Sequence, residues 1–315
     1  MFRLTEIEKA ANYIKEGKVV AFPTETVYGL GANAFNALAV AKIFEIKERP
    51  TFDPLIVHIS KIEYINELIS TEDERVYKIA EKFWPGPLTI VLQKKSNIPD
   101  IVTAGLQTVG IRMPKNEIAL KLIELSGCPI AAPSANKFGK VSPTTAQHVK
   151  KQLPNVDFII DGGKTNVGIE STIIKLNEKG FEILRYGIIT KEEIEKIVPY
   201  HCETDNYNKI LASGMMKSHY SPEKPIFILG KHNIPFPANE LGFISFSKKN
   251  TSGYKKVIYV SENNDLKEYA VNLFSSIHQL EESDVKAIVA EPVEEKGIGM
   301  AIMDRLKKAA YRFHH

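Results

Sequence analysis

The segment KERPTFDPLIVHI, from Lys47 to Ile59, changes within a few residues from the end of a helix to a strand. Pro50 and Pro54 stiffen the connection, because the proline ring fixes one backbone torsion. In the strand after Pro54, alternate side chains point to opposite faces, which separates His58 from the apolar face of that strand. A helix followed closely by a short apolar strand is typical of an α/β domain.

Helical and strand patterns continue in this way to about residue 200. Helices are predicted over residues 5–17, 37–47, 117–127, 144–153 and 190–198, and strands over residues 19–22, 54–59, 88–92, 108–113, 129–134, 158–161, 171–176 and 181–186. The order lacks the strict strand–helix repeat of a doubly wound domain. We therefore expect a mixed, twisted sheet covered by helices.

A second, smaller domain is predicted beyond a polar connection. From residue 199 to 225 the apolar rhythm stops, and a connection of this length is usually a linker or a functional loop. Strands are then predicted over 226–230, 241–246, 255–260 and 286–292, and helices over 265–281 and 300–313, in a Rossmann-like order. The expected boundaries are 1–203 for the first α/β domain, 204–225 for a linker or lid, and 226–315 for the second domain.

The composition is that of a globular protein. Of the 315 residues, 43% are hydrophobic and 25% are charged. No apolar run approaches the ~18 residues of a membrane span, and the N-terminal segment lacks the apolar core of a secretion signal. We expect a cytoplasmic location and no membrane contact. The two cysteines are too few for a disulfide framework.

Positive charge gathers in one part of the chain. The net charge is only +3, which argues against a protein whose whole surface follows a nucleic-acid backbone. Residues 101–150 nevertheless hold six Lys or Arg and two acidic residues. Such a cluster is either a solvated face or a site for an anionic ligand, and it leaves room for a weak RNA contact.

Three segments carry the polar residues from which a site could be built. In FPTETVYGLGANA, residues 22–34, a strand that stops at Pro23 should release Thr26 and its neighbours into a loop, where Gly29 and Gly31 let the backbone approach a ligand. In PSANKFGKVSPTT, residues 133–145, small residues flank Ser134 and Asn136. Ser142 is predicted at a helix N-terminus, which is a natural phosphate site.

The third segment is TVGIRMP, residues 108–114, where Arg112 ends a strand that cannot continue and should present its guanidinium at a sheet edge. Thr172 and Arg185 add a hydroxyl and a cation further along the chain. The set contains no paired carboxylates, cysteine nucleophile or metal-ligand cluster. It favours a site that binds a nucleotide and a small carboxylate and joins them by positioning and charge neutralisation.

These motifs, in this order, resemble those of the YrdC-type threonylcarbamoyl-AMP synthases. The matching segments are FPTETVYGLGANA, KERPTFDPLIVHI, WPGPLTIVL, VGIRMP, PSANKFGKVSPT, GIESTII and LRYG. The segment SGMMKSHYSP and the residues after it resemble the longer form of the family, which has a C-terminal Rossmann-like domain. The resemblance covers nearly the whole chain.

The resemblance implies a nucleotidyltransferase that makes threonylcarbamoyl-AMP and pyrophosphate from L-threonine, bicarbonate or CO2, and ATP. Mg2+ is expected with ATP. The product would pass to a tRNA threonylcarbamoyl transferase complex, which modifies adenosine beside the anticodon.

The resemblance also assigns roles to single residues. L-threonine would be held by Thr26, His58, Arg112, Ala132 and Thr172. ATP would be held by Lys47, Arg49, Asp53, Thr108, Ser134, Asn136, Ser142, Arg185, His219 and Tyr220. Lys47 and Arg49 would stabilise charge on the reacting groups, and no protein ligand for a metal is assigned. His219 and Tyr220 would fold over the nucleotide as a lid.

Two positions depart from the family pattern. Asp53 stands where an asparagine is expected, and an acid beside phosphates needs Mg2+ or a neighbouring cation. The linker lacks the usual proline after Ser213 and the arginine before His219. Two other functions remain open at this point: an RNA-binding protein, and a carbamoyl-phosphate-using relative from hydrogenase maturation, whose additional acylphosphatase and zinc-finger regions are absent here.

Overall fold

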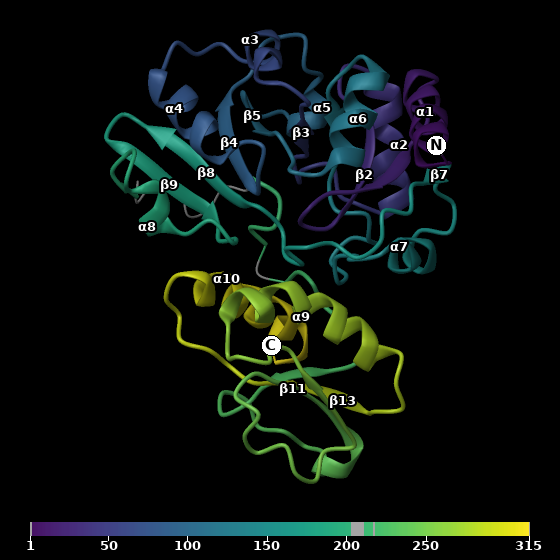
Figure 1. The fold of residues 1–315 in the computed structure, drawn as a ribbon, viewed down its shortest axis with the longest axis vertical. Coiled ribbons are helices and arrows are strands. Elements are labelled where there is room, and N and C mark those ends of the chain that lie inside the picture. The colour runs from purple at the N-terminus through teal and green to yellow at the C-terminus, as the bar shows by residue number, and fades with distance from the viewer. Residues whose placement is uncertain (1, 203–210, 217, 315) are drawn as a thin grey trace.

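The computed structural model describes residues 2–202, 211–216 and 218–314, and Figure 1 shows two α/β units in it. The first unit surrounds a nine-stranded sheet, and the second surrounds a four-stranded sheet. The first sheet ends at Arg185 and the second begins at Ile226. The part of the predicted linker at 204–210 and residue 217 lies outside the described residues.

The first sheet is mixed, as expected. Its order is β7-β1-β2-β6-β3-β5-β4-β8-β9, with β1 Val20–Pro23, β2 Tyr28–Asn33, β3 Ile56–His58, β4 Leu88–Gln93, β5 Thr108–Arg112, β6 Ile130–Ala131, β7 Phe158–Ile159, β8 Thr172–Asn177 and β9 Gly180–Arg185. Strand β3 pairs in parallel with β5 and antiparallel with β6. Alternation along the predicted strand is also confirmed, because Val57 lies in the main apolar core while His58 lines a cavity.

Helices cover this sheet. They are α1 Phe2–Lys15, α2 Ala37–Lys47, α3 Ile65–Leu68, α4 Glu74–Phe83, α5 Asp100–Thr103, α6 Glu117–Ser126, α7 Ala146–Gln152 and α8 Lys191–Ile194, with a 3-10 turn η1 at Ile62–Tyr64. Helix α4 is not among the helices predicted from the sequence, although its signals are present there. Asp73 caps its first turn, and Val76, Ile79 and Ala80 are buried at helical spacing.

The predicted glycine loop at residues 24–34 is wrong from Tyr28 onward. Strand β2 pairs antiparallel with β1, with Pro23 opposite Tyr28, so only residues 24–27 form the turn. A Cβ on Gly31 would lie 2.5 Å from a methyl carbon of Ile130 and 2.7 Å from the ring of Phe22. Gly31 is therefore needed for packing inside the sheet and not for the approach of a ligand.

Two further predictions are corrected by the element boundaries. Helix α7 begins at Ala146 and Thr145 caps it, so Ser142 lies before the helix and not at its N-terminus. Strand β5, which ends at Arg112, lies between β3 and β4 in the sheet. The Arg112 side chain thus emerges from the end of an interior strand and not from an edge strand.

The second sheet is entirely parallel, in the order β10-β13-β11-β12. Its elements are β10 Ile226–Ile228, β11 Leu241–Ser245, β12 Lys256–Tyr259, β13 Ala287–Ala290, α9 Leu266–Glu281 and α10 Ile298–Ala310, with 3-10 turns η3 Ala238–Glu240 and η4 Tyr311–Phe313. In Figure 1, α9 and α10 lie on the side of this sheet that faces the first unit.

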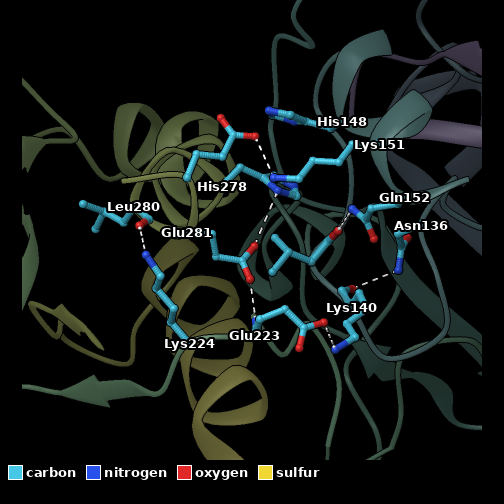
Figure 2. A network of polar contacts seen from close by, with 12 residues as sticks. Asn136, Lys140, His148, Lys151, Gln152, Glu223, Lys224, His278, Leu280 and Glu281 are labelled. Atoms are coloured by element: carbon cyan, nitrogen blue, oxygen red, sulfur yellow. Dashed lines mark hydrogen bonds and ion pairs between the residues drawn. The ribbon is translucent and has the colours of Figure 1, made fainter. Parts of the chain in front are cut away.

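The two units pack against each other along a seam. Val27, Val141 and Ile169 of the first unit belong to the same buried apolar cluster as Phe274 of α9. Figure 2 shows the polar part of the seam, where the rings of His148 and His278 stack with their centroids 4.0 Å apart. Nε2 of His278 lies 3.1 Å from the carbonyl oxygen of Ser142. No helix among the described residues is long and apolar enough to cross a membrane.

Candidate functional site

A small cavity lies in the first unit, where strand ends meet the turn between β1 and β2. Of the residues predicted for a site, its walls include Thr26, His58, Arg112, Ala132, Ser134 and Arg185. His58 and Arg112 lie opposite each other in the parallel pair of β3 and β5, so both strands deliver them to the same end of the sheet. The cavity has a volume of about 30 Å³, which is space for roughly two waters. A larger ligand therefore needs its walls to move.

His58 and Arg112 form one wall of this cavity. Burial, together with the nearby Arg112 guanidinium, lowers the pKa of His58 to about 3, so the imidazole is neutral at physiological pH. Nη2 of Arg112 lies 2.8 Å from a carboxylate oxygen of Glu25, and both side chains are almost fully buried. Nδ1 of His58 is buried without a hydrogen-bond partner among the described residues, so the wall retains a ring nitrogen for a ligand.

The other residues predicted to bind threonine divide into two groups. Thr26 lies in the turn, where its hydroxyl is 2.7 Å from that of Thr24, and Ala132 lies opposite it on the cavity wall. Thr172 begins β8, and its hydroxyl donates to the carbonyl of Ile189 at 2.7 Å. Thr172 is not among the residues that line the cavity. Its proposed contact with threonine stays a prediction.

Lys47 is buried beside the cavity. Its Nζ donates to the carbonyl of Ser134 at 2.6 Å and also to that of Asn136. Burial and the nearby Arg49 lower the pKa of Lys47 well below its usual value. An anion bound here would reverse that effect, because it would favour the charged ammonium group.

Arg49 follows the end of α2, where Glu48 turns the chain in a left-handed conformation with φ 53°. Nη2 of Arg49 lies 2.9 Å from Oδ2 of Asp53, and it also donates to the hydroxyl of Ser213 at 3.2 Å. Burial raises the pKa of Asp53, and Arg49 partly offsets that rise. Arg49 is therefore the neighbouring cation that Asp53 was expected to need.

Ser213, from the described part of the linker, connects two arginines. Its carbonyl accepts from Nη1 of Arg185 at 3.2 Å, while its hydroxyl accepts from Arg49. Arg185 also donates to the carbonyl of Ser171 at 3.0 Å. Ser213 lines the cavity although it was not predicted as a site residue. Ser213 thus contributes to one side of the cavity.

Asn136 and Ser142 hold the wall behind the cavity. The amide of Asn136 donates to the carbonyls of Lys137 and Lys140 at 2.8 and 2.9 Å, and its Oδ1 is buried without a partner among the described residues. The hydroxyl of Ser142 donates to Glu170, which lines the cavity. Sequence reasoning missed Glu170. The signal was available, since it is the one acid in the motif GIESTII.

Thr108 lies apart from the cavity. It begins β5, four positions before Arg112 on the same face of the strand, a separation of roughly 13 Å at the usual rise per residue. It lines a smaller neighbouring cavity together with Pro54 and Ser213. A ligand would have to extend past Ser213 to reach it.

His219 and Tyr220 are packed into the seam and are not among the lining residues. The ring of Tyr220 is fully buried and lies 5.3 Å from that of Phe274, between ring centroids. The ring of His219 contacts those of Phe138 and Tyr220 edge-on. Burial lowers the pKa of His219 to about 3. The lid role predicted for these two residues remains a prediction.

The charges around the cavity do not cancel. Three acids pair with arginines, as Glu25 with Arg112, Asp53 with Arg49 and Glu170 with Arg305. Among the described residues, Lys47 and Arg185 instead form hydrogen bonds only to carbonyl and hydroxyl oxygens. Two buried cations therefore remain for an anionic ligand.

Comparison with known families matches both units. A model of the Sua5, YciO and YrdC proteins, described as telomere recombination, matches residues 12–187. A second model, described as the C-terminal domain of threonylcarbamoyl-AMP synthase, matches residues 189–311. The chain belongs to the threonylcarbamoyl-AMP synthase family.

Individual members of this family are similar over almost the whole chain. The threonylcarbamoyl-AMP synthase of Pyrococcus abyssi is 44% identical over 97% of this chain and 94% of its own length, and that of Bacillus subtilis is 42% identical over 97% and 93%. A solved structure of P. abyssi Sua5 complexed with L-threonine has a TM-score of 0.86 and 42% identity, and it covers 97% of this chain and 94% of that one.

Membership in the threonylcarbamoyl-AMP synthase family confirms the two-domain fold and the function expected from the sequence, and it makes the chain an enzyme. It favours this function over the two others that the sequence left open. The basic cluster at 101–150 is largely neutralised, since Arg112, Lys121, Lys137 and Lys140 each pair with an acid.

Proposed function

We propose that this chain joins L-threonine, bicarbonate or CO2, and ATP in the cavity, and releases threonylcarbamoyl-AMP and pyrophosphate. The observation that carries the proposal is the pair of buried basic side chains, Lys47 and Arg185, which form no ion pair with a carboxylate among the described residues. They lie beside a wall lined with hydroxyl groups and Arg112. A polyanion would supply the charges that these cations lack.

The threonine end of the site is assigned to Arg112, His58 and Thr26. A guanidinium can hold a carboxylate with two parallel hydrogen bonds. Glu25 occupies Arg112 in this structure, so the substrate carboxylate would share or replace that contact. Neutral His58 can accept from the amine or hydroxyl of threonine without adding a positive charge beside them. The complex of the P. abyssi relative with L-threonine supports threonine as a ligand of this fold.

The nucleotide end is assigned to Lys47, Arg49 and Arg185, with Ser134 and Asn136 on the wall beside them. The neutral threonine amine first adds CO2 and loses a proton to solvent, which leaves a carbamate anion. A carbamate oxygen then forms a bond to the α-phosphorus, while the bond from that phosphorus to the bridging oxygen breaks and pyrophosphate leaves with its electron pair. The three cations would stabilise the charge that spreads over the phosphoryl oxygens.

Mg2+ is proposed to arrive with ATP, on its phosphates. No group of three or more His, Cys, Asp or Glu residues suited to a metal occurs among the described residues. The nearest acids, Asp53 and Glu170, are each held by an arginine. Mg2+ commonly keeps several waters and binds through substrate phosphates. When bound there, it would neutralise charge on the departing pyrophosphate.

Three further parts of the function remain proposals. The product would be passed to a tRNA threonylcarbamoyl transferase complex, because a mixed anhydride of this kind hydrolyses in water. Any RNA contact would be weak, given the ion pairs that neutralise the basic cluster. The cytoplasmic location expected from the sequence also stays a prediction.

The test is pyrophosphate release from ATP by the purified full chain, in the absence of RNA. We expect release only when threonine, bicarbonate and Mg2+ are all present, and we expect threonylcarbamoyl-AMP by mass spectrometry. Serine serves as the matched control substrate, because it lacks only the methyl group of threonine. Release that does not depend on threonine, or that requires RNA, would contradict the proposal.

A further inference from the structure

Arg305, on α10 of the second unit, reaches across the seam to the wall of the cavity. Its side chain is fully buried, and its Nε donates to Oε2 of Glu170 at 3.0 Å. Its Nη1 donates to Asp304 at 2.7 Å, and its guanidinium carbon lies 5.1 Å from the centre of the Tyr220 ring. Since Glu170 lines the cavity, the second unit contributes a charge to the site and does more than carry the linker.

The charge on Glu170 depends on this contact. Burial by itself would raise the pKa of Glu170, but Arg305, then Arg185 and the Ser142 hydroxyl, outweigh burial and hold it at about 2. Ser142 donates to one carboxylate oxygen and Arg305 to the other. The carboxylate is therefore ionised at neutral pH and is held at both oxygens.

Arg185 is the cation that would replace Arg305 beside Glu170. Glu170 and Arg185 interact electrostatically in the buried wall. Arg185 otherwise contacts only Ser171 and Ser213 in the hydrogen bonds that the structure gives it. If Arg305 were absent, Glu170 would carry an uncompensated charge, and its attraction would draw Arg185 away from a nucleotide. The same negative charge would also repel the phosphates.

Helix α10 also holds the linker on this side of the site. Nζ of Lys308 donates to the carbonyl of Gly214 at 2.7 Å, next to Ser213, which contacts Arg185 and Arg49. Asp304 accepts from both Arg305 and Lys308. Arg305 thus belongs to a set of linked polar groups that joins the second unit, Gly214 and the cavity wall.

We propose that Arg305 is a positioning residue for the synthase reaction: it neutralises Glu170 and so leaves Arg185 available to the phosphates of the nucleotide. This inference rests on the function proposed above. It means that the second unit contributes to nucleotide binding through Arg305, in addition to forming its own fold.

The first experiment compares Arg305→Met, Arg305→Lys and wild type in the full chain. Methionine keeps much of the buried volume and removes the charge, whereas lysine keeps the charge. We expect Arg305→Met to raise the KM for ATP at least about tenfold, the effect of losing one charge-assisted contact, with a smaller change in the KM for threonine. Arg305→Lys should recover most of the loss. Lys307→Met is the matched control, because Lys307 lies on the same helix in an exposed ion pair with Glu295.

The second experiment separates this role from a purely structural one. In the double variant Glu170→Gln with Arg305→Met, no buried charge remains to compete for Arg185, so the KM for ATP should return toward the wild-type value. In Arg305→Met alone, the KM should rise with pH as Glu170 ionises, whereas in the double variant it should not.

Several outcomes would overturn the inference. An unchanged KM for ATP in folded Arg305→Met would do so, and so would a double variant whose KM is as high as that of Arg305→Met. If Arg305→Met does not fold, the double variant is measured in its place, because positions 170 and 305 are then both neutral. A wild-type KM for ATP in the double variant supports the inference, and a raised KM overturns it. A wild-type chain without threonine-dependent pyrophosphate release would instead contradict the proposed function.

Discussion

The acidic side chains near the strand ends have different partners in the two sheets of this protein. In the second unit, Glu291 follows β13, and its Oε2 accepts from the backbone of Phe246 and Ser247 at 2.7 and 3.0 Å. In the first unit, Glu170 and Asp53 are held by arginine side chains beside a cavity. A carboxylate that accepts hydrogen bonds from backbone N–H groups holds a loop in place, and those N–H groups are then not available to a ligand. Acids bound by side-chain cations form a set whose partners can change when a ligand arrives.

The buried polar atoms that lack a hydrogen bond also differ between the cavity of the first unit and the sheet of the second. Among the described residues, buried side-chain atoms without a partner include Nδ1 of His58, which lines the cavity, and Oδ1 of Asn136 beside it. None of these atoms belongs to a residue of the parallel sheet of the second unit. Since buried polar groups usually find partners, a local excess of unpartnered ones indicates a binding site.

The largest expected effect comes from Arg49→Ala. We expect synthesis to fall on the order of 100- to 1,000-fold, because one preorganised charge-stabilising group is lost, while the chain stays folded. The measurement is threonine-dependent pyrophosphate release, with circular dichroism to check folding. Arg49→Ala combined with Asp53→Asn is the control for the unpaired acid. Near-normal turnover in Arg49→Ala would remove Arg49 from the catalytic set.

Arg112→Lys should have the next largest effect. Lysine keeps the positive charge but cannot form two parallel bonds to a carboxylate. We expect the KM for threonine to rise about 10- to 100-fold, equivalent to one charge-assisted hydrogen bond, with the KM for ATP little changed. A rise in the KM for ATP alone would move Arg112 to the nucleotide end of the site.

Glu291→Met tests the other side of the comparison. Methionine has a similar size but accepts no hydrogen bond from the three groups that Glu291 serves, which also include the Ser245 hydroxyl. The free energy of unfolding should fall by about 1 kcal/mol, the usual net contribution of such hydrogen bonds, because the donors are only partly buried. The specific activity of the folded enzyme should be unchanged. A selective loss of activity would mean that this end of the second sheet also serves the reaction.

The smallest effect is expected at the seam, for His278→Gln. Burial and the stacked His148 lower the pKa of His278 to about 3. Because the unfolded chain binds this proton first, the free energy of unfolding should fall as the pH drops below about 6.5, by about 1 kcal/mol to about pH 5.5. Glutamine can keep the contact with the Ser142 carbonyl without titrating. Urea unfolding at several pH values should therefore show a shallower dependence in the variant, and an equal slope would exclude His278 as its source.

The sequence predicted the local parts of the site well. Proline-bounded strands and period-two alternation place His58 opposite the apolar core, and strand ends place Arg112 beside it. The prediction for Gly31 was wrong, because a glycine that permits close packing of a strand looks the same in sequence as one in a loop, whereas Gly29 does line the cavity. Only the contact of Gly31 with Ile130 distinguishes the two cases.

The sequence by itself determined the two α/β units, the family and most of the polar residues around the cavity. Periodicity, turn residues and short motifs are properties of neighbouring positions, so they can be read along the chain. The tertiary structure alone decided which charges meet: Asp53 with Arg49, Glu25 with Arg112, and Glu170 with Arg305. Glu170 and Arg305 are 135 positions apart. Their contact exists because the two units bury their apolar faces against each other. The position of Arg305 opposite Glu170 depends on that packing, and no local sequence pattern predicts it.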